Sequence, residues 1–330
     1  MKIVIDDNIP FIDGRIPGAD IRILPAGKIC RETVHDADAV MVRTRTRCDA
    51  SLLEGSNVRV VATATIGLDH IDIPWCESHG IAARNAPGCN APGVAVYVWA
   101  SLLRSGFDPR KHTLGVVGCG HVGGIVAQWG RRLGAKVLVC DPPRAAAEYT
   151  DHEYISLEEL LEQSDAVTLH TPLTRSGDCP TFHLINEKTL RFLKEGAIFV
   201  NAARGEVAET RALCDAIRSH RISKAIIDTW EGEPVIDREL LELADVATCH
   251  IAGYSRQGKE RATRMALEAV GECLGIPVIT DGLQGAYTEP SIITREILME
   301  KFDPAPLTAE LKSHPEKFES MRNGYPLHNE

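Results

Sequence analysis

The chain has 330 residues, of which 44% are hydrophobic and 25% are charged, a composition typical of a globular protein with room for two domains. Its formal net charge of −10 argues against a nucleic-acid scaffold, which would carry a basic field. No run of about eighteen apolar residues is present, so we predict no membrane-spanning helix, and the N-terminus MKIVIDDNIP lacks the long apolar core of a signal peptide.

Ten cysteines are present, and none belongs to a CxxC pair. They lie singly in apolar runs, such as Cys140 in VLVC and Cys249 in ATCH, and a chain of this size does not need disulfides. We therefore predict reduced thiols, mostly in the core of a cytoplasmic protein. A zinc site is the alternative, but no tight Cys/His cluster supports it, so we expect no metal.

Short apolar strands alternate with helical patterns along the chain, which predicts an α/β protein with parallel sheets. In the first part the predicted strands are KIVI, IRIL, AVMV and VRVV. The segment APGCNAPG, residues 86–93, is rich in Gly and Pro and indicates a crossing between two units. A long apolar helix over about 94–103 follows it.

The second unit has a more regular pattern. It begins with the strand LGVV, the turn GCGHVGG and a helix that ends near Gly134, followed by the strand KVLVC, which stops at Asp141. Ser156 and Glu159 fit a capping box at the start of a further helix. The remaining strands are AVTLH, AIFVNA, KAIID and VATCH, and a helical segment follows over 256–275. From residue 276 onward the pattern is irregular and broken by prolines, which predicts a small appended segment.

The turn GCGHVG matches the pattern GxGxxG at Gly118, Gly120 and Gly123, between a strand and a helix. Gly118 permits a tight turn, Gly120 lets backbone N–H groups approach a pyrophosphate, and Gly123 lets helix and strand pack closely. Asp141 follows at about the spacing expected for a residue that binds the ribose hydroxyls, and its charge favours NAD over NADP. Arg144 could hold a 2′-phosphate, which keeps NADP as the alternative. The structural alternative is a plain βα turn with a capping aspartate.

Three polar residues lie at or just beyond the ends of consecutive predicted strands in this unit. Arg204 follows AIFVNA, Glu233 follows KAIID in the segment DTWEGEP, and His250 ends VATCH. Ligands of open α/β sheets bind at the carboxyl ends of strands. His250 would take the hydroxyl proton of a 2-hydroxy acid, Glu233 would hold the imidazole, and Arg204 would bind the substrate carboxylate. Each residue alone has a structural alternative: a loop ion pair, a solvated turn or a structural histidine.

The order GCGHVG, Asp141, NAARG, DTWEGEP and HIAGY resembles the D-isomer-specific 2-hydroxyacid dehydrogenase family, over nearly the whole chain to about residue 275. That resemblance implies two Rossmann-like, doubly wound parallel-sheet domains, with the cofactor domain inserted into the substrate domain. We therefore expect a substrate-binding domain of residues 1–92 and 256–275, an NAD-binding domain of residues 93–255, and a short C-terminal segment of the dimerisation type, residues 276–330. The active site is expected in the cleft between the domains.

The resemblance also implies roles for individual residues. Arg204, Glu233 and His250 correspond to the family's catalytic Arg, Glu and His. The implied cofactor-binding residues are Gly118, Gly120, His121, Val122, Gly123, Asp141, Thr171, Ala202, Ala203, Asp228 and Gly253, with Asp228 meeting the nicotinamide amide. The segments MKIVIDDNIPF, TATIGLDHID, CDPPR and HIAGYSRQGK resemble the branch of the family that oxidises 4-phospho-D-erythronate to 2-oxo-3-hydroxy-4-phosphobutanoate in pyridoxal phosphate synthesis. By that resemblance Thr44, Thr65 and Tyr254 contact the substrate.

The segment VRTRTR places Arg43, Arg45 and Arg47 at alternating positions after the strand AVMV. In an extended chain these side chains share one face. A substrate with a phosphate at one end and a carboxylate at the other needs more cations than Arg204, so we expect Arg43 or Arg45 among the phosphate ligands. A solvated basic edge is the alternative.

We therefore predict an NAD-dependent dehydrogenase of a phosphorylated 2-hydroxy acid that acts as a homodimer, with no nucleic-acid or membrane partner. Within the enzyme class the alternative substrates are 3-phosphoglycerate, hydroxypyruvate and glyoxylate. From another class, the same fold serves NAD-sensing corepressors, but the acidic charge and the absence of low-complexity arms argue against that function.

Overall fold

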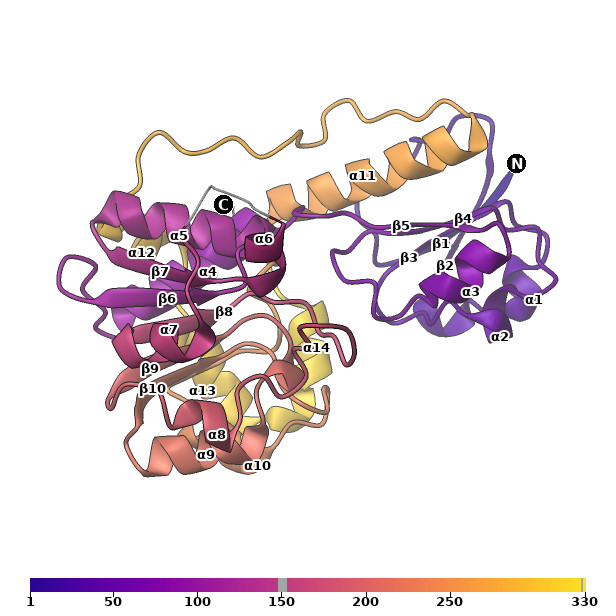
Figure 1. The fold of residues 1–330 in the computed structure, drawn as a ribbon. Coiled ribbons are helices and arrows are strands. Elements are labelled where there is room, and N and C mark those ends of the chain that lie inside the picture. The colour runs from indigo at the N-terminus through magenta and orange to yellow at the C-terminus, as the bar shows by residue number, and fades with distance from the viewer. Residues whose placement is uncertain (148–152, 328) are drawn as a thin grey trace. The chain divides into compact units, whose positions relative to one another are not determined.

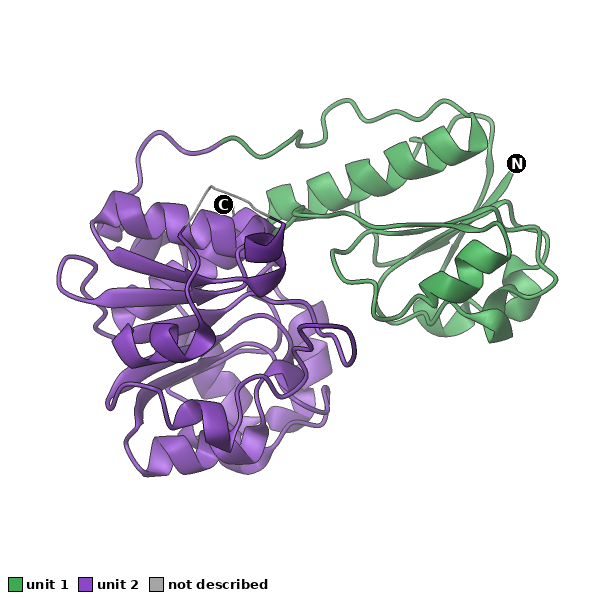
Figure 2. Ribbon diagram, in the orientation of Figure 1, with its two compact units in different colours: residues 1–90, 255–288 green, residues 91–254, 289–330 purple. Residues whose placement is uncertain are grey.

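The computed structural model describes residues 1–147, 153–327 and 329–330. The chain forms two compact units, shown in different colours in Figure 2. Unit 1 consists of residues 1–90 and 255–288, and unit 2 of residues 91–254 and 289–330. The chain therefore enters unit 2 twice, and unit 1 is built from two separate segments.

Unit 1 is organised around a five-stranded parallel sheet (Figure 1). Its strands are β1 Lys2–Asp6, β2 Asp20–Leu24, β3 Ala39–Val42, β4 Val60–Thr63 and β5 Ala82–Arg84, in the order β2-β1-β3-β4-β5. The chain winds outward in both directions from the neighbours β1 and β3, where Ile3 pairs with Ala39. This boundary between β1 and β3 is the topological switch point of the unit, where open α/β sheets bind ligands.

Apolar side chains cover both faces of this sheet, because successive residues of a strand point to opposite sides. Ile3 and Ile5 of β1 pack in a cluster with Leu267 of α11 Arg256–Leu274, whereas Val4 packs in a second cluster with Val34 at the end of α1 Arg31–Val34. The other helices of the unit are α2 Ala50–Leu53, α3 Ile73–Ser78 and the 3₁₀ turn Ala26–Lys28. Figure 1 shows α11 on one side of the sheet and α1–α3 on the other.

Unit 2 contains a six-stranded parallel sheet in the order β11-β10-β9-β8-β6-β7. Its strands are β6 Thr113–Val117, β7 Lys136–Cys140, β8 Ala166–Leu169, β9 Ala197–Asn201, β10 Ile222–Ile227 and β11 Val246–Ala247. The strand order reverses between β6 and β8, so the switch point lies beside the glycine-rich turn that follows β6.

Helices cover both faces of the second sheet. They are α4 Ala91–Arg104, α5 His121–Leu133, α6 Pro142–Ala146, α7 Leu157–Gln163, α8 Glu187–Leu190, α9 Thr210–Arg218, α10 Arg238–Leu243, α12 Arg295–Lys301, α13 Ala305–Ser313 and α14 Phe318–Asn323, with 3₁₀ turns at Gly205–Val207 and Pro315–Lys317. Helix α5 ends as predicted, because Gly134 adopts a left-handed conformation with φ 97°. The predicted capping box at α7 is present, with Ser156 and Glu159 bonding each other's backbone N–H groups. In the described part of the chain, no helix is both long and apolar enough to cross a membrane.

The C-terminal part divides differently from the predicted segment 276–330. Residues up to Thr288 belong to unit 1, and residues from Glu289 onward belong to unit 2. The reason lies in their apolar side chains: Phe302, Leu311 and Phe318 are buried in the same hydrophobic core as the sheet of unit 2. The irregular pattern thus contains three helices, α12 to α14, that pack on their own chain.

The predicted fold class is confirmed, since both units are α/β with all-parallel sheets. All ten cysteines are thiols, and seven of them are buried. Cys30 and Cys179 are exposed, and the seven buried cysteines agree with the expectation of mostly core positions. Burial raises the pKa of the Cys140 thiol to about 11, which keeps it protonated and unreactive at neutral pH.

Candidate active site

The predicted catalytic residues follow neighbouring strands of the sheet in unit 2. Arg204 comes after β9, Glu233 after β10 and His250 after β11. These three strands are adjacent and parallel. Because the strands are parallel, their carboxyl ends meet at one edge of the sheet. The same edge carries the glycine-rich turn after β6.

Glu233 and His250 are in direct contact. Nδ1 of His250 lies 2.9 Å from Oε2 of Glu233, and Oε1 of the same carboxylate accepts the backbone N–H of Trp230 at 2.9 Å. Burial alone would raise the pKa of Glu233, but the charge and hydrogen bond of His250 and the Trp230 amide outweigh it and lower that pKa. The ionised carboxylate therefore accepts the Nδ1–H of the imidazole. That tautomer directs the lone pair of Nε2 away from Glu233.

The backbone of His250 is in the left-handed region, with φ 57°. Non-glycine residues there cost about 1–3 kcal/mol, and such strain concentrates at functional sites. The strained residue is held on both sides: its N–H donates to the Asp228 carbonyl at 2.9 Å, and the following amides of Ile251 and Ala252 donate to the Asp228 carboxylate at 2.8 and 3.0 Å. Asp228 thus fixes the loop that carries His250.

The Asp228 carboxyl is buried, and its pKa reflects opposing effects. Burial raises that pKa, and His250 together with hydrogen bonds from Thr248, Ile251 and Ala252 partly opposes the increase. The Thr248 hydroxyl donates to Oδ1 at 2.6 Å and lies 2.8 Å from the hydroxyl of Tyr97 in α4. The resemblance implied only a nicotinamide contact for Asp228. Its links to Thr248 and Tyr97 were not predicted, because hydrogen bonds of this kind leave no spacing in the sequence.

Arg204 extends from a turn that Asn201 shapes. The Asn201 side chain donates to the carbonyl of Arg204 at 3.0 Å and accepts the N–H of Ala203 at 3.1 Å. The half-buried guanidinium donates to the Ala203 carbonyl at 2.8 Å. The residue after Arg204 must be a glycine. A Cβ on Gly205 would lie 2.0 Å from the carbonyl carbon of Trp230, so only glycine lets the Arg204 turn pack this closely on the loop after β10. The Arg204 turn therefore packs directly against the loop that leads to Glu233.

The glycine-rich turn has the close packing of a dinucleotide site. A Cβ on Gly123 would lie 1.9 Å from the Gly118 carbonyl oxygen, and one on Gly118 would lie 2.8 Å from the backbone of His170 after β8. Apart from Gly120 itself and its chain neighbours, no described protein atom lies within 4 Å of the Cβ position of Gly120. Gly118 and Gly123 thus serve packing within the protein, while the backbone at Gly120 is open to a ligand. His121 and Val122 form the first turn of α5 beside it.

Asp141 is bound to the glycine-rich turn. Its Oδ2 accepts the N–H of Cys119 at 2.7 Å, and its Oδ1 accepts the N–H of Arg144 at 3.2 Å as the cap of α6. Each carboxylate oxygen has a second acceptor direction, so these bonds are compatible with ribose hydroxyls. The Nε of Arg144 donates to the Tyr154 hydroxyl at 3.2 Å.

Two buried polar atoms lie at the end of β8, next to Gly118. Nδ1 of His170 and Oγ1 of Thr171 have no hydrogen-bond partner among the described residues. Nε2 of His170 contacts the Thr168 hydroxyl at 2.9 Å, and burial lowers the pKa of the imidazole to about 3, so the ring is neutral. Buried polar atoms of this kind fit a bound cofactor that supplies the missing partner. Thr171 was predicted here, whereas His170 was missed.

The other predicted cofactor residues lie in the loops at this edge of the sheet. Ala202 and Ala203 form the turn between Asn201 and Arg204, and Gly253 follows the His250 loop. Tyr254 comes directly before Ser255, which caps α11.

The substrate residues predicted in unit 1 follow β3 and β4. The expectation that Arg43, Arg45 and Arg47 share one face of an extended chain is wrong, because the chain turns here and the Thr46 N–H donates to the Arg43 carbonyl at 3.3 Å. Arg47 instead forms an ion pair with Asp49 at 2.6 Å.

The remaining unit 1 candidates lie at the carboxyl edge of its sheet. Arg43 follows β3 and donates to the carbonyl of Asn8, which follows β1, at 3.4 Å, so it lies at the switch point. Thr44 and Arg45 lie in the exposed turn. The Thr65 hydroxyl contacts that of Thr63, the last residue of β4, at 2.7 Å.

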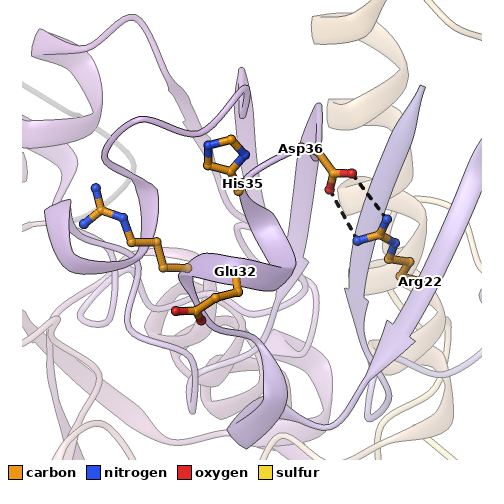
Figure 3. Close-up of a pocket in the computed structure, with 5 residues that line it drawn as sticks. Arg22, Glu32, His35 and Asp36 are labelled. Atoms are coloured by element: carbon orange, nitrogen blue, oxygen red, sulfur yellow. Dashed lines mark hydrogen bonds and ion pairs between the residues drawn. The ribbon is translucent and has the colours of Figure 1, made fainter.

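A surface pocket in unit 1 contains none of the predicted site residues. It is lined by Arg22 of β2 together with Arg31, Glu32, His35 and Asp36 of α1 and its C-terminal end. Figure 3 shows Arg22 turned toward Asp36, with contacts of 3.3 and 3.4 Å. A hydrogen bond from Lys2 lowers the pKa of Asp36, although some burial opposes this. The charge of Asp36 is thus paired with Arg22 and Lys2 within the protein. We therefore interpret this pocket as a surface held by ion pairs.

Comparisons with known proteins identify relatives of this chain. Residues 93–252 match the family model described as "D-isomer specific 2-hydroxyacid dehydrogenase, NAD binding domain". The erythronate-4-phosphate dehydrogenase of Bacteroides thetaiotaomicron is 43% identical over 339 aligned positions, which cover 100% of this chain and 97% of the relative. The enzyme of the same name from Porphyromonas gingivalis is 42% identical, with 99% and 92% covered.

Solved structures share the fold. D-lactate dehydrogenase from Aquifex aeolicus, complexed with NAD and lactic acid, has a TM-score of 0.71 at 24% identity and covers 84% of this chain and 99% of its own. D-2-hydroxyisocaproate dehydrogenase has a TM-score of 0.67 at 23% identity, with 85% and 100% covered. These matches confirm the predicted architecture and the NAD-binding domain.

Proposed function

Because this chain belongs to the D-isomer specific 2-hydroxyacid dehydrogenase family, we propose that it oxidises 4-phospho-D-erythronate to 2-oxo-3-hydroxy-4-phosphobutanoate, with NAD as its cofactor. Family membership makes the chain an NAD-dependent oxidoreductase that acts on a CH–OH group. The proposed substrate is the one named for the erythronate-4-phosphate dehydrogenases, two of which match this chain over at least nine-tenths of their own length. The contact between Glu233 and His250, at the sheet edge that also carries the glycine-rich turn, is the observation on which the chemistry rests.

His250 is the general base of the proposed reaction. Its Nδ1–H is engaged by Glu233, so Nε2 accepts the proton from the C2 hydroxyl of the substrate. The resulting imidazolium is stabilised by the Glu233 carboxylate. In the reverse direction the same nitrogen returns the proton to the C2 oxygen.

Arg204 binds the carboxylate of the hydroxy acid in this proposal. A guanidinium presents paired donors that match the two oxygens of a carboxylate. The Asn201 hydrogen bonds and the close packing at Gly205 hold the turn that presents it. Tyr254 is proposed as a further substrate contact.

The substrate phosphate is assigned to unit 1. Arg43 and Arg45, with Thr44 and Thr65, follow the strands β3 and β4 that end at its ligand-binding edge. Arg47 is not included, since it pairs with Asp49.

The glycine-rich turn fits NAD. The open backbone at Gly120 and the first turn of α5 would hold the pyrophosphate, Asp141 the adenosine ribose, and the unpartnered atoms of His170 and Thr171 would contact the bound molecule. When bound, NAD supplies the acceptor for the hydride that leaves C2. Ala202, Ala203, Asp228 and Gly253 are proposed as the remaining cofactor contacts.

The decisive experiment compares NADH formation from 4-phospho-D-erythronate, unphosphorylated D-erythronate and 3-phosphoglycerate. We expect a kcat/KM for the first that exceeds each of the others by at least about tenfold, since each charge-assisted hydrogen bond to the phosphate contributes about 1.5–3 kcal/mol. Preference for another acid would retain the Arg–Glu–His chemistry and reject the substrate. NAD binding without turnover of any acid would reject the enzymatic function in favour of NAD sensing.

The phosphate assignment has its own matched pair of variants. Arg43→Ala combined with Arg45→Ala should abolish most of the preference for the phosphorylated acid over D-erythronate. Arg47→Ala should leave that preference unchanged, because Arg47 is engaged by Asp49. Equal behaviour of the two variants would contradict the assignment.

We also propose a cytoplasmic homodimer that works in pyridoxal phosphate synthesis. Ten cysteine thiols without a disulfide support a reducing compartment. The pathway follows from the proposed substrate, and sedimentation of the purified protein tests the dimer.

A further inference from the structure

The last helix of the chain, α14, places a buried arginine beside the catalytic pair. Phe318, the first residue of α14, is buried in the core of unit 2 and anchors the helix there. One turn later, Arg322 has only 8% of its surface exposed. Arginine is almost never this buried without a specific partner.

Arg322 interacts with two side chains of the candidate active site and with the charge of Glu319, one turn earlier in its own helix. Its Nη1 lies 3.9 Å from Oε2 of Glu233, the same oxygen that contacts His250. Its guanidinium also hydrogen-bonds the side chain of Tyr254, whose ring packs edge-on against Tyr325 at 6.3 Å. The arginine thus connects the loop after β10 with the loop after β11.

This placement is costly for the fold alone. Nε of Arg322 is buried and has no hydrogen-bond partner in the described part of the chain. A buried donor left unsatisfied costs about 1–3 kcal/mol, and replacement of buried ion pairs by apolar side chains is often neutral or stabilising. An apolar residue would therefore satisfy the packing of α14 at lower cost, so the cation is better explained by what it does to Glu233 and Tyr254.

We propose that Arg322 is a positioning residue, which holds the Glu233 carboxylate and the Tyr254 hydroxyl in place so that the C-terminal segment completes the active site of its own chain. The inference rests on the proposed dehydrogenase function. Arg322 acts through these two neighbours: it fixes the acceptor for the His250 Nδ1–H and the orientation of a proposed substrate contact.

The electrostatics around the pair are consistent with this role. The Arg322 charge contributes to the lowered pKa of Glu233, after the larger effects of burial, His250 and Trp230. A carboxylate kept ionised leaves the proton on His250 once the imidazole has accepted it. The other titratable groups that interact with this cluster are Asp228, Cys249 and Tyr325, together with Glu319 of α14, whose charge acts on Arg322.

The test compares Arg322→Met and Arg322→Lys with Lys317→Met, which removes an exposed cation from the residue that precedes α14. We expect Arg322→Met to lower kcat by about 10- to 100-fold, the range for loss of one hydrogen bond to a charged group. The KM for the hydroxy acid should change by less than about threefold, and the Kd for NAD should not change. Arg322→Lys should recover part of kcat, and Lys317→Met should resemble the wild type.

A double-mutant cycle with Tyr254→Phe separates positioning from a general packing defect. If Arg322 acts through Tyr254, the kcat losses of the two single variants will not add in the double variant. Additive losses, or an unchanged kcat in Arg322→Met, would overturn the proposal. If Arg322→Met does not fold, the cycle of Arg322→Lys with Tyr254→Phe gives the same decision.

Failure of the proposed function and failure of the Arg322 proposal give different results. A wild-type chain that turns over no hydroxy acid rejects the function. The contact between Arg322 and Tyr254 is then tested by urea unfolding of the wild type, the two single variants and the double variant. If the changes in the free energy of unfolding are additive, the contact is rejected.

Discussion

At the scale of a single residue, the carboxylate of Glu233 holds its surroundings together through its negative charge. It accepts from the imidazole of His250 and the amide of Trp230, and it faces the guanidinium of Arg322. Glutamine has nearly the same shape but no charge, and it could present an N–H to His250. Glu233→Gln therefore isolates the charge from the packing.

We expect Glu233→Gln to lower kcat by about 10²- to 10⁴-fold, the range for disabling a general base, because the imidazole loses both its orientation and the stabilisation of its charged form. NAD affinity should be retained, as measured by titration of protein fluorescence. Glu195→Gln, an exposed position in the loop before β9, serves as the control. A variant with normal turnover would show that His250 does not depend on Glu233.

The same substitution has a pH signature in stability. Folding lowers the pKa of Glu233 below its ordinary value of 4.5, so its charge stabilises the folded state above about pH 4.5. That contribution is lost as the pH falls through the folded-state pKa. The urea midpoint of Glu233→Gln should lie below that of the wild type at pH 7, and the gap should narrow below about pH 4.5. A gap that does not vary with pH would contradict this.

At the scale of structural elements, the close approach of two loops sets the position of Arg204. The Cβ of an alanine at position 205 would lie 2.0 Å from a backbone carbonyl carbon of Trp230, which cannot rotate away as a side chain can. The 3₁₀ turn Gly205–Val207 must therefore shift, and Arg204 with it.

We predict that Gly205→Ala destabilises unit 2 by about 1–3 kcal/mol and raises the KM for the hydroxy acid more than the Kd for NAD. Steady-state kinetics and urea unfolding measure the two effects. Gly27→Ala is the matched control, because no described atom lies within 4 Å of its Cβ position and its φ is not positive. An unchanged KM in Gly205→Ala would contradict the role of this packing in placing Arg204.

The elements that the sequence predicts are those with continuous apolar runs. Strands such as AIFV are identifiable because both faces of a parallel sheet are buried. Strand β5, Ala82–Arg84, has no such run and was missed. Helices α12, α13 and α14 were missed because the nearby prolines suggested breaks. Pro306, however, lies in the first turn of α13, where its missing N–H has no cost.

The candidate active site likewise contains residues that the sequence predicts and residues that it does not. Arg204, Glu233 and His250 could be predicted, because each follows a predicted strand of one unit and parallel strands bring such residues to one edge of the sheet. Asn201 and Thr248 act through hydrogen bonds to nearby loops, which no spacing in the sequence reveals. Arg322 lies far along the chain in a segment without a motif, so only the packing of α14 shows where it goes.

At the scale of the whole molecule, each unit has a hydrophobic core of its own. One cluster contains the sheet and helices of unit 2, including α12 to α14, and two clusters lie on the faces of the sheet in unit 1. We therefore expect two unfolding transitions rather than one.

NAD should move only the transition of unit 2. A ligand that binds the folded state at 100 times its Kd stabilises that state by about 2.7 kcal/mol. Calorimetry with and without NAD measures the shift, and fragments protected from proteolysis assign each transition to its unit. NADP at the same concentration should have a smaller effect, because Asp141 repels a 2′-phosphate. A single transition, or equal shifts of both, would contradict the independence of the units.

The interleaved order of the two units also has a consequence during synthesis on the ribosome. The sheet of unit 1 is complete when residue 90 has emerged, but α11, which covers one of its faces, belongs to the segment after residue 254. At about 5–20 residues per second the apolar face of this sheet stays uncovered for tens of seconds at the slower rates. Arg322 emerges after Arg204, Glu233 and His250, so the nascent chain can place its arginine beside Glu233 only once α14 has been synthesised.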